Sequence, residues 1–109
     1  MGKPVAGEVV VIPFPQTNLQ AGKSRPALVV VSLPGDDLIL CQITSQTRHD
    51  GFSIPLVSTD FDQGSLSVAS FVRPNRLFTV EQSVIRRSAG RIKPDKLLAV
   101  LSAIRDIFS

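Results

Sequence analysis

The fold of this chain is decided by the stretch Pro26-Ala27-Leu28-Val29-Val30-Val31-Ser32, an almost uninterrupted apolar run rich in valine. β-Branched residues favour strands, and a strand without polar alternation is typically buried on both faces. Runs of similar character lie before it at residues 7–12 and after it at residues 38–43. We therefore expect three neighbouring strands, of which the middle one is covered on both sides.

Turn residues separate these runs from one another and from those that follow. Pro13 and Pro15 end the first strand, because proline cannot donate to a central ladder, and residues 16–24 form a polar loop. The Pro-Gly-Asp-Asp sequence at 34–37 predicts a tight turn. Further along, the pattern predicts an edge strand containing a proline at 52–57, a loop at 60–64, and short strands at 67–72 and 77–80.

The end of the chain has a different period. Apolar residues recur there at intervals of three and four, which is typical of one face of an α-helix: Leu97, Val100, Leu101, Ile104, Ile107 and Phe108. Pro94 suits the first helical turn, and Asp95 complements its positive end. Five or six short strands and one amphipathic helix predict a mainly β domain over residues 1–109: a small, strongly bent antiparallel sheet, closed or nearly closed into a barrel, with the helix packed against it.

Composition excludes several classes of protein. The chain of 109 residues is 43% hydrophobic and 19% charged, which indicates a globular protein and not a disordered one. No apolar stretch approaches the ~20 residues that span a bilayer, and the start lacks the apolar core of a signal peptide, so we expect no membrane segment and a cytoplasmic location. With one cysteine, Cys41, and one histidine, His49, the chain has no internal disulfide and too few ligands for a tetrahedral zinc site. Cys41 lies in an apolar strand pattern and is expected to be buried and inert.

The basic residues suggest an anionic partner. Lysine and arginine number 12 against 9 acidic residues, a net charge of +3. Eight of the 12 are arginine, whose planar guanidinium matches phosphate oxygens two at a time.

Three polar segments interrupt the strands. In the first, Pro26 holds Arg25 in an extended conformation at the mouth of a strand, where it either binds phosphate or pairs with an acid such as Glu8. The second, Ile-Thr-Ser-Gln-Thr-Arg at 43–48, either satisfies turn backbone or bonds to phosphates and base edges. The third, Ser-Phe-Val-Arg-Pro-Asn-Arg at 70–76, is either a solvated turn or a basic site at a bend set by proline.

Together these segments resemble the MazF/PemK toxins of bacterial toxin–antitoxin pairs. The matching blocks, in the family's order, are GEVVVIPFP at 7–15, KSRPALVV at 23–30, ITSQ at 43–46 and SFVRPNRLFTV at 70–80. The resemblance extends from about Gly7 into the C-terminal helix. It implies an SH3-like barrel, a homodimer, a cognate antitoxin partner, and a sequence-specific endoribonuclease that cuts single-stranded RNA, mostly mRNA, without metal or other cofactor.

The resemblance also assigns residues. Arg25 matches the arginine that acts on the scissile phosphate, Thr44 the hydroxyl residue beside it, and Arg73 a second arginine that acts as general acid or stabilises the phosphorane. The ribose 2′-hydroxyl is the nucleophile, so the products are a 2′,3′-cyclic phosphate and a 5′-hydroxyl. Residues expected to bind RNA are Gln16, Thr17, Asn18, Lys23, Ser45, Gln46, Arg48, Asn75 and Arg76.

Departures from the family pattern leave the general base unassigned. Asn75 stands where many relatives have an aspartate base, and Asn18 where an aspartate is common in the first loop. Gln16 replaces an apolar or aromatic residue. His49 titrates in a suitable range, but it is also explained as an exposed loop residue. Asn75 has a second interpretation as a reader of adenine edges.

Two alternatives to an active nuclease follow. One is a gyrase-binding toxin of the CcdB kind, which the Ile107-Phe108 end of the helix permits, although we expect these two residues to belong to the core. The other is a weakened or inactive relative that only binds RNA. The matched arginines and the Thr-Ser-Gln block favour the nuclease, and with six Phe and no Trp or Tyr its RNA recognition should depend on hydrogen bonds and charge.

Overall fold

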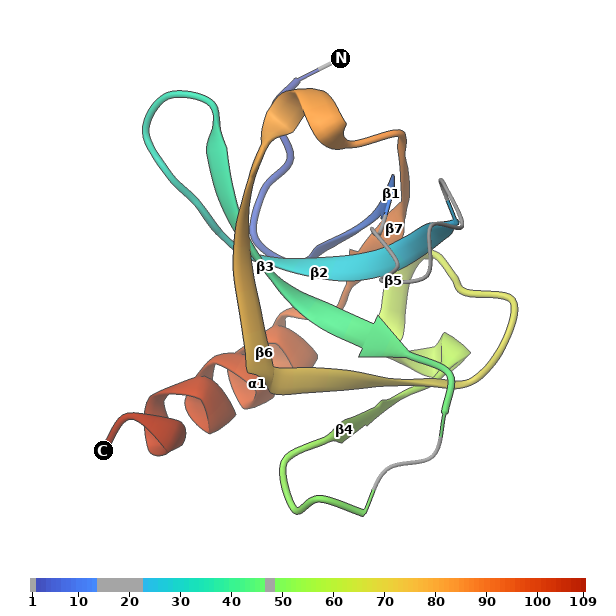
Figure 1. The fold of residues 1–109 in the computed structure, drawn as a ribbon. Coiled ribbons are helices and arrows are strands. Elements are labelled where there is room, and N and C mark those ends of the chain that lie inside the picture. The colour runs from blue at the N-terminus through green and yellow to red at the C-terminus, as the bar shows by residue number, and fades with distance from the viewer. Residues whose placement is uncertain (1, 14–22, 47–48) are drawn as a thin grey trace.

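A single curled sheet of seven antiparallel strands and one C-terminal helix make up the computed structural model, which describes residues 2–13, 23–46 and 49–109 (Figure 1). The strands are β1 (Glu8–Pro13), β2 (Ser24–Ser32), β3 (Asp37–Thr44), β4 (Ile54–Leu56), β5 (Phe61–Gly64), β6 (Ser70–Glu81) and β7 (Arg87–Ile92). Short 3₁₀ turns occupy Ser58–Asp60 and Gln82–Val84, and α1 spans Pro94–Ile107. The strand order across the sheet is β4-β6-β3-β2-β1-β7-β5.

The middle of the sheet confirms the sequence prediction. β1, β2 and β3 are consecutive neighbours, and Ala27 to Val30 of β2 are buried. Gly35 lies in the turn between β2 and β3 with a φ of +81°, as the Pro-Gly-Asp-Asp pattern predicts. β4, with its Pro55, is an edge strand.

The sheet curls so that each of its faces covers a separate apolar cluster. One cluster lies between the sheet and α1: Val9, Leu28, Val30, Cys41, Ile43, Leu56, Phe61, Val72, Ile92 and Val100. The other lies on the opposite face: Val10, Ile12, Ala27, Val29, Leu38 and Leu40, with Phe78, Val80 and Ile85 packed against them. Cys41 is fully buried, as expected, and burial raises the pKa of its thiol to about 12.

The segments at 67–72 and 77–80 were predicted as two separate strands, and the separation is wrong. They form one strand, β6, with a sharp corner that Figure 1 shows beside α1. At the corner, the consecutive residues Cys41 and Gln42 of β3 pair with Leu77 and Arg73, so that residues 74–76 are extra and leave the ladder. Such an insertion bends a strand without ending it.

Two other predictions in this half of the chain need correction. Residues 60–64 were expected to be a loop, but Phe61–Gly64 form β5, which pairs with β7. The pattern also did not assign β7, which has the mixed sequence Arg-Ser-Ala-Gly-Arg-Ile. Both strands exist because they close the curled sheet at its second edge, a long-range pairing that local propensity does not encode.

Helix α1 begins at Pro94 as predicted, with Leu97, Leu101 and Ile104 packed against the cluster around Val100. The expectation that Ile107 and Phe108 belong to the core is wrong, because they are 37% and 76% exposed. The last turn of α1 lies beside the segment before β4, where Asp106 and Ile107 line an open cavity of about 220 Å³ together with Gly51 and Phe52. No helix among the described residues is both long and apolar enough to cross a membrane.

Candidate active site

Strand register places the three predicted catalytic residues on one face of the sheet. Ala27 of β2 pairs with Gln42 of β3, which pairs in turn with Arg73 of β6. Side chains on a strand alternate between faces, so Arg25 and Thr44, each two residues from this row, share its face. The distance from Arg25 to Arg73 is roughly two strand spacings across and two residues along, about 12 Å between Cα atoms, which two arginine side chains can bridge.

Arg73 is held by two side chains. Its Nη1 donates to Oε1 of Gln42 at 3.3 Å, and its Nη2 lies 3.7 Å from Oδ2 of Asp50. The side chain of Arg73 is only 11% exposed, so these contacts are partly shielded from solvent and bias the orientation of the guanidinium.

Asp50 is itself fixed by the turn that contains it. Its Oδ1 accepts from the backbone N–H groups of Phe52 and Ser53, both at 3.0 Å, and its Oδ2 accepts from the Ser53 hydroxyl at 3.3 Å. The hydrogen bonds from the Phe52 and Ser53 N–H groups lower the pKa of Asp50 below its ordinary value of 3.8, and the Ser53 hydroxyl and Arg73 add smaller effects in the same direction. Asp50 is therefore a carboxylate at neutral pH.

Thr44 and its neighbours end β3. The Thr44 hydroxyl oxygen accepts from the N–H of Gln46 at 3.1 Å, so the turn-forming interpretation of this segment is correct. A hydroxyl has one proton to donate as well, which leaves Thr44 able to bond to an oxygen of a ligand. Ser45 and Gln46 are exposed directly beyond it.

The β6 corner presents Asn75 and Arg76. Pro74 is fully buried and anchors the corner, while Asn75 and Arg76 are exposed and lie outside the ladder. Arg76 lines a cavity of about 350 Å³ together with Ile12 and Gln42. Gln42 thus lies between the Arg73 network and this cavity.

A larger cavity, of about 490 Å³, includes Arg25 in its wall. Its lining combines apolar, hydroxyl and basic residues from β1, β2, β3, β7 and the segment before β6: Val11, Ser24, Arg25, Pro26, Ile43, Ser45, Ser65, Leu66, Ser67, Val68, Ser70, Arg87 and Ala89. We call it the serine–arginine pocket.

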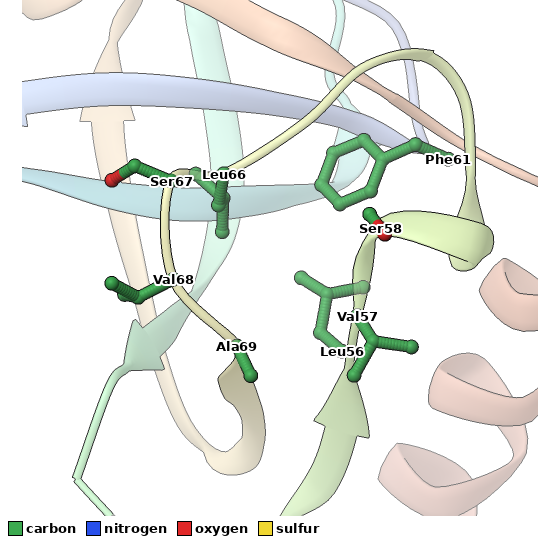
Figure 2. Close-up of a pocket in the computed structure, with 8 residues that line it drawn as sticks. All are labelled: Leu56, Val57, Ser58, Phe61, Leu66, Ser67, Val68 and Ala69. Carbon is green, nitrogen blue, oxygen red and sulfur yellow. The ribbon is translucent and has the colours of Figure 1, made fainter.

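A smaller cavity of about 220 Å³ lies on the other side of segment 66–69 and has no charged residue in its lining. Figure 2 shows it between this segment and the side chains of Leu56 and Phe61. The side chains of Ser67 and Val68 point away from Leu56 and Phe61 in this view, and both also line the serine–arginine pocket.

The predicted alternative for Arg25, an ion pair with Glu8, is not formed. Glu8 lies at the far end of β1, four residues from the Ile12 that pairs with Arg25, and its Oε1 accepts from the N–H of Val5. Among residues 2–13, 23–46 and 49–109, no ion pair or side-chain hydrogen bond to Arg25 is formed.

The remaining predicted residues divide into two groups. Lys23 is exposed just before β2, and His49 is exposed beside Asp50. Gln16, Thr17, Asn18 and Arg48 lie outside the residues that the structure describes, as does most of the predicted loop 16–24.

Sequence reasoning missed Gln42, Asp50 and Arg87. Gln42 was recognisable as a polar residue inside an otherwise apolar strand, and Asp50-Gly51 with Ser53 is a typical turn sequence in which the aspartate caps backbone N–H groups. No local signal connects Asp50 to Arg73, which follows it by 23 residues. Arg87 belongs to the unassigned strand β7.

Comparison with known proteins identifies the family. Residues 6–108 match the family model described as PemK-like, MazF-like toxin of type II toxin–antitoxin system, and the chain belongs to this family. No curated protein matched by sequence.

Solved structures support the fold. MazF from Deinococcus radiodurans superposes with a TM-score of 0.76 at 23% identity, covering 99% of this chain and 98% of that one. The MazE–MazF complex of the same organism gives a TM-score of 0.78 at 21% identity, with coverage of 98% and 97%. A protein described as an endoribonuclease from a mycobacterial species gives 0.73 at 16% identity, with coverage of 99% and 93%. These similarities confirm the mainly β architecture with a C-terminal helix.

Proposed function

We propose that this chain is a metal-independent, sequence-specific endoribonuclease, the toxin half of a toxin–antitoxin pair, and that it cuts single-stranded RNA, mainly mRNA. The observation that supports this best is the common sheet face of Arg25, Thr44 and Arg73, with Arg73 held by Gln42 and Asp50. Membership of the toxin family and the likeness to a mycobacterial endoribonuclease point in the same direction.

In the proposed reaction, the 2′-hydroxyl of one ribose attacks the adjacent phosphorus and the bond to the 5′-oxygen of the next nucleotide breaks. The nucleophile's proton leaves with a base, the leaving oxygen gains a proton, and the products are a 2′,3′-cyclic phosphate and a 5′-hydroxyl. Negative charge on the phosphoryl oxygens grows in the transition state. Arg25 and Arg73 stabilise that charge, and Thr44 donates a hydrogen bond to a phosphate oxygen.

The contacts of Arg73 favour one of its two expected roles. Gln42 accepts a hydrogen bond from the guanidinium, and the carboxylate of Asp50 forms an ion pair with it. Both contacts stabilise the positively charged form of Arg73. An arginine held in this way is a poor proton donor, so we assign Arg73 to charge stabilisation and not to acid catalysis. Gln42 and Asp50 are positioning residues, which reduce the reorganisation needed when the phosphate arrives.

Asn75 and Asn18 cannot act as the general base, and we do not assign this role to Asp50 in their place. Its pKa is lowered by the backbone N–H groups of its own turn, and a carboxylate stabilised in this way accepts a proton reluctantly. The general base is therefore unassigned. His49, which is exposed next to Asp50, is one candidate for this role, and a pH–rate profile would test it.

Partners form part of the same proposal. A structural neighbour is an endoribonuclease bound to its cognate antitoxin, and we propose an antitoxin for this chain as well. We also propose that the chain acts in the cytoplasm as a homodimer, in which two copies form one RNA groove. Light scattering on the purified protein would measure its oligomeric state, and a monomer at micromolar concentration would contradict the dimer.

The experiment that tests the nuclease is cleavage of a long single-stranded RNA in EDTA by wild type, Arg25→Ala, Arg73→Lys and Arg105→Ala. Loss of a positioned charge stabiliser typically lowers kcat by about 10²–10³, so Arg25→Ala and Arg73→Lys should be strongly impaired. Arg105→Ala is the matched control, because Arg105 is exposed in the last turn of α1. RNA left intact by a folded wild type would contradict the proposal.

A gyrase-binding toxin remains the second candidate, because Phe108 at the end of α1 is 76% exposed and offers an apolar side chain to a protein. Phe108→Ser separates the two candidates. It should leave RNA cleavage at the wild-type rate if the protein is a nuclease, and it should abolish gyrase inhibition if the protein is a gyrase poison. Salt-dependent RNA binding without cleavage would identify the weakened, RNA-binding relative.

A further inference from the structure

We infer that the turn at residues 50–53 couples the last turn of α1 to Arg73, and that Gly51 and Phe52 are further positioning residues for the proposed reaction. The inference rests on the proposed nuclease function and extends the support of Arg73 beyond the two side chains that contact it. Its consequence is that a change at the end of α1, at residues with no assigned contact to RNA, alters kcat.

Hydrogen bonds make the turn a single unit. The Asp50 carboxylate accepts from the N–H groups of Phe52 and Ser53, both at 3.0 Å, and from the Ser53 hydroxyl at 3.3 Å. Between these residues, Gly51 has a φ of +78°, a left-handed conformation that glycine adopts without steric cost. A displacement of the Phe52 backbone therefore either carries the Asp50 carboxylate with it or breaks the hydrogen bonds that hold that carboxylate in place.

One side of the turn is attached to Arg73. Oδ2 of Asp50 lies 3.7 Å from Nη2 of Arg73. The strand that follows the turn, β4, begins at Ile54, which pairs with Val72, the residue before Arg73 (Figure 1). Because the ion-pair distance exceeds the roughly 2.7–2.9 Å of a charge-assisted hydrogen bond, a shift of the turn by about 1 Å either closes this contact or removes it. The orientation of Arg73 is therefore sensitive to small movements of the turn.

The other side of the turn lies beside α1. Gly51 and Phe52 line an open cavity of about 220 Å³ together with Ala103, Asp106 and Ile107. Phe52 is 47% exposed and Ile107 is 37% exposed, so more than half of each residue is covered. Since both apolar residues border the same cavity, their partial burial holds the turn against the helix, and the open space between them leaves the turn room to shift.

The helix is a fixed support for this turn. Three apolar residues of α1 pack against the main apolar cluster: Leu97, Leu101 and Ile104. Within residues 49–53, by contrast, no side chain belongs to that cluster, and the first residue to pack on it is Ile54. The position of Asp50 therefore depends on how Phe52 lies against α1. Loosening this junction releases Arg73 without changing the sheet face that carries the proposed catalytic residues.

The first test removes apolar side chains from each side of the cavity. Phe52→Ala and Ile107→Ala should each lower kcat for RNA cleavage by roughly three- to tenfold, with a smaller change in KM, because Arg73 is less well oriented when the phosphate arrives. Phe52→Leu keeps an apolar side chain and should retain most of the rate. Phe108→Ala is the matched control, since Phe108 is 76% exposed and does not line the cavity.

The second test changes the backbone of the turn. Gly51 and Gly35 have φ values of +78° and +81°, and an added Cβ at either position would meet no described residue within 4 Å apart from its chain neighbours. Alanine therefore strains only the backbone, and both variants should lose similar stability in urea denaturation. Gly51→Ala alone should lower kcat, because only this turn carries Asp50. Similar stability together with the same kcat in both variants would contradict the coupling.

The third test asks whether the effect passes through Asp50. In an Asp50→Asn background, Phe52→Ala and Ile107→Ala should cause no further loss of kcat, because the link to Arg73 is already removed. The pKa of the Asp50 carboxyl, measured by NMR, is a readout that a general loss of stability does not move. Both variants loosen the N–H hydrogen bonds that lower this pKa, so it should rise toward its ordinary value of 3.8 in them and stay unchanged in Phe108→Ala.

The outcomes separate this inference from the proposed function. If wild type cuts RNA while Phe52→Ala and Ile107→Ala cut at the rate of Phe108→Ala, the coupling is refuted and the nuclease stands. Losses of kcat that add in full to the loss in Asp50→Asn would also refute it, because they would arise by another route. If a folded wild type cuts no RNA, the proposed function fails. The pKa of Asp50 then tests the coupling without RNA, and an unchanged value in the two variants overturns it.

Discussion

Gly90→Ala should destabilise the protein far more than an ordinary glycine-to-alanine change, because two strands meet there through their glycines. Gly64 of β5 pairs with Gly90 of β7. A Cβ built on Gly90 would lie 2.1 Å from the carbonyl oxygen of Gln63, and one on Gly64 would lie 2.1 Å from that of Ala89. Since such contacts essentially never fall below 3.0 Å, the two strands would have to separate by about 0.9 Å or more.

The expected cost has two parts. Gly90 has a φ of +151°, a conformation that costs an alanine about 1–3 kcal/mol. Separation of the strands weakens backbone hydrogen bonds worth about 1 kcal/mol each. We therefore expect a loss of about 2–4 kcal/mol in the free energy of unfolding.

Gly35→Ala is the matched control, since Gly35 also has a positive φ, +81°, but its added Cβ would meet no described residue within 4 Å apart from its chain neighbours. It should cost only the backbone strain, about 1–2 kcal/mol. Urea denaturation of both variants measures the difference. Equal losses would refute the reasoning that close approach of β5 and β7 limits this position.

The other predictions concern Asp50 and Cys41. Asp50→Asn keeps the size of the side chain but removes its charge, and it should lower kcat at least tenfold with a smaller change in KM, because the orientation of Arg73 is lost; an unchanged kcat would exclude the positioning role. The lowered pKa of Asp50 makes its carboxylate stabilise the folded state above the ordinary value of 3.8, and this contribution disappears as the pH falls through the lowered value. Acid titration should therefore show the stability gap between wild type and Asp50→Asn narrowing below pH 3.8, and a gap independent of pH would contradict this. Cys41, buried with a pKa of about 12, should react with a thiol reagent only as the protein unfolds, and rapid labelling under native conditions would show that it is accessible.

The parts of the fold that the sequence predicted well are those with a strong local pattern. The valine run predicts strand β2, and the apolar period predicts helix α1. Pro55 predicts an edge strand, because a proline cannot donate to a second neighbouring strand. The corner of β6 was misinterpreted because Pro74 resembles a strand break; only the continuous partner β3 shows that the strand goes on. β5 was missed because its sequence Phe-Asp-Gln-Gly has little β propensity, and its existence depends on Gly90, 26 residues after Gly64.

The residues of the candidate site also divide into those that local sequence predicts and those that depend on tertiary contacts. Arg25, Thr44 and Arg73 were predicted from the motifs that resemble the toxin family, and the sheet register brings them to one face. Asp50 could not be paired with Arg73 from sequence, because their contact depends on how the segment after β3 folds back onto β6. Ile107 and Phe108 have the period of a buried face, but the period does not show where the sheet beneath the helix ends.

The most direct test of the central claim is to incubate the purified protein and its Arg25→Ala variant with a long single-stranded RNA in EDTA and to map the new 5′ ends. The account predicts discrete cuts by wild type, each with a 5′-hydroxyl and a 2′,3′-cyclic phosphate, and a loss of about 10²–10³ in rate for the variant. Intact RNA with a folded wild type, or cuts of equal rate by both proteins, would contradict it.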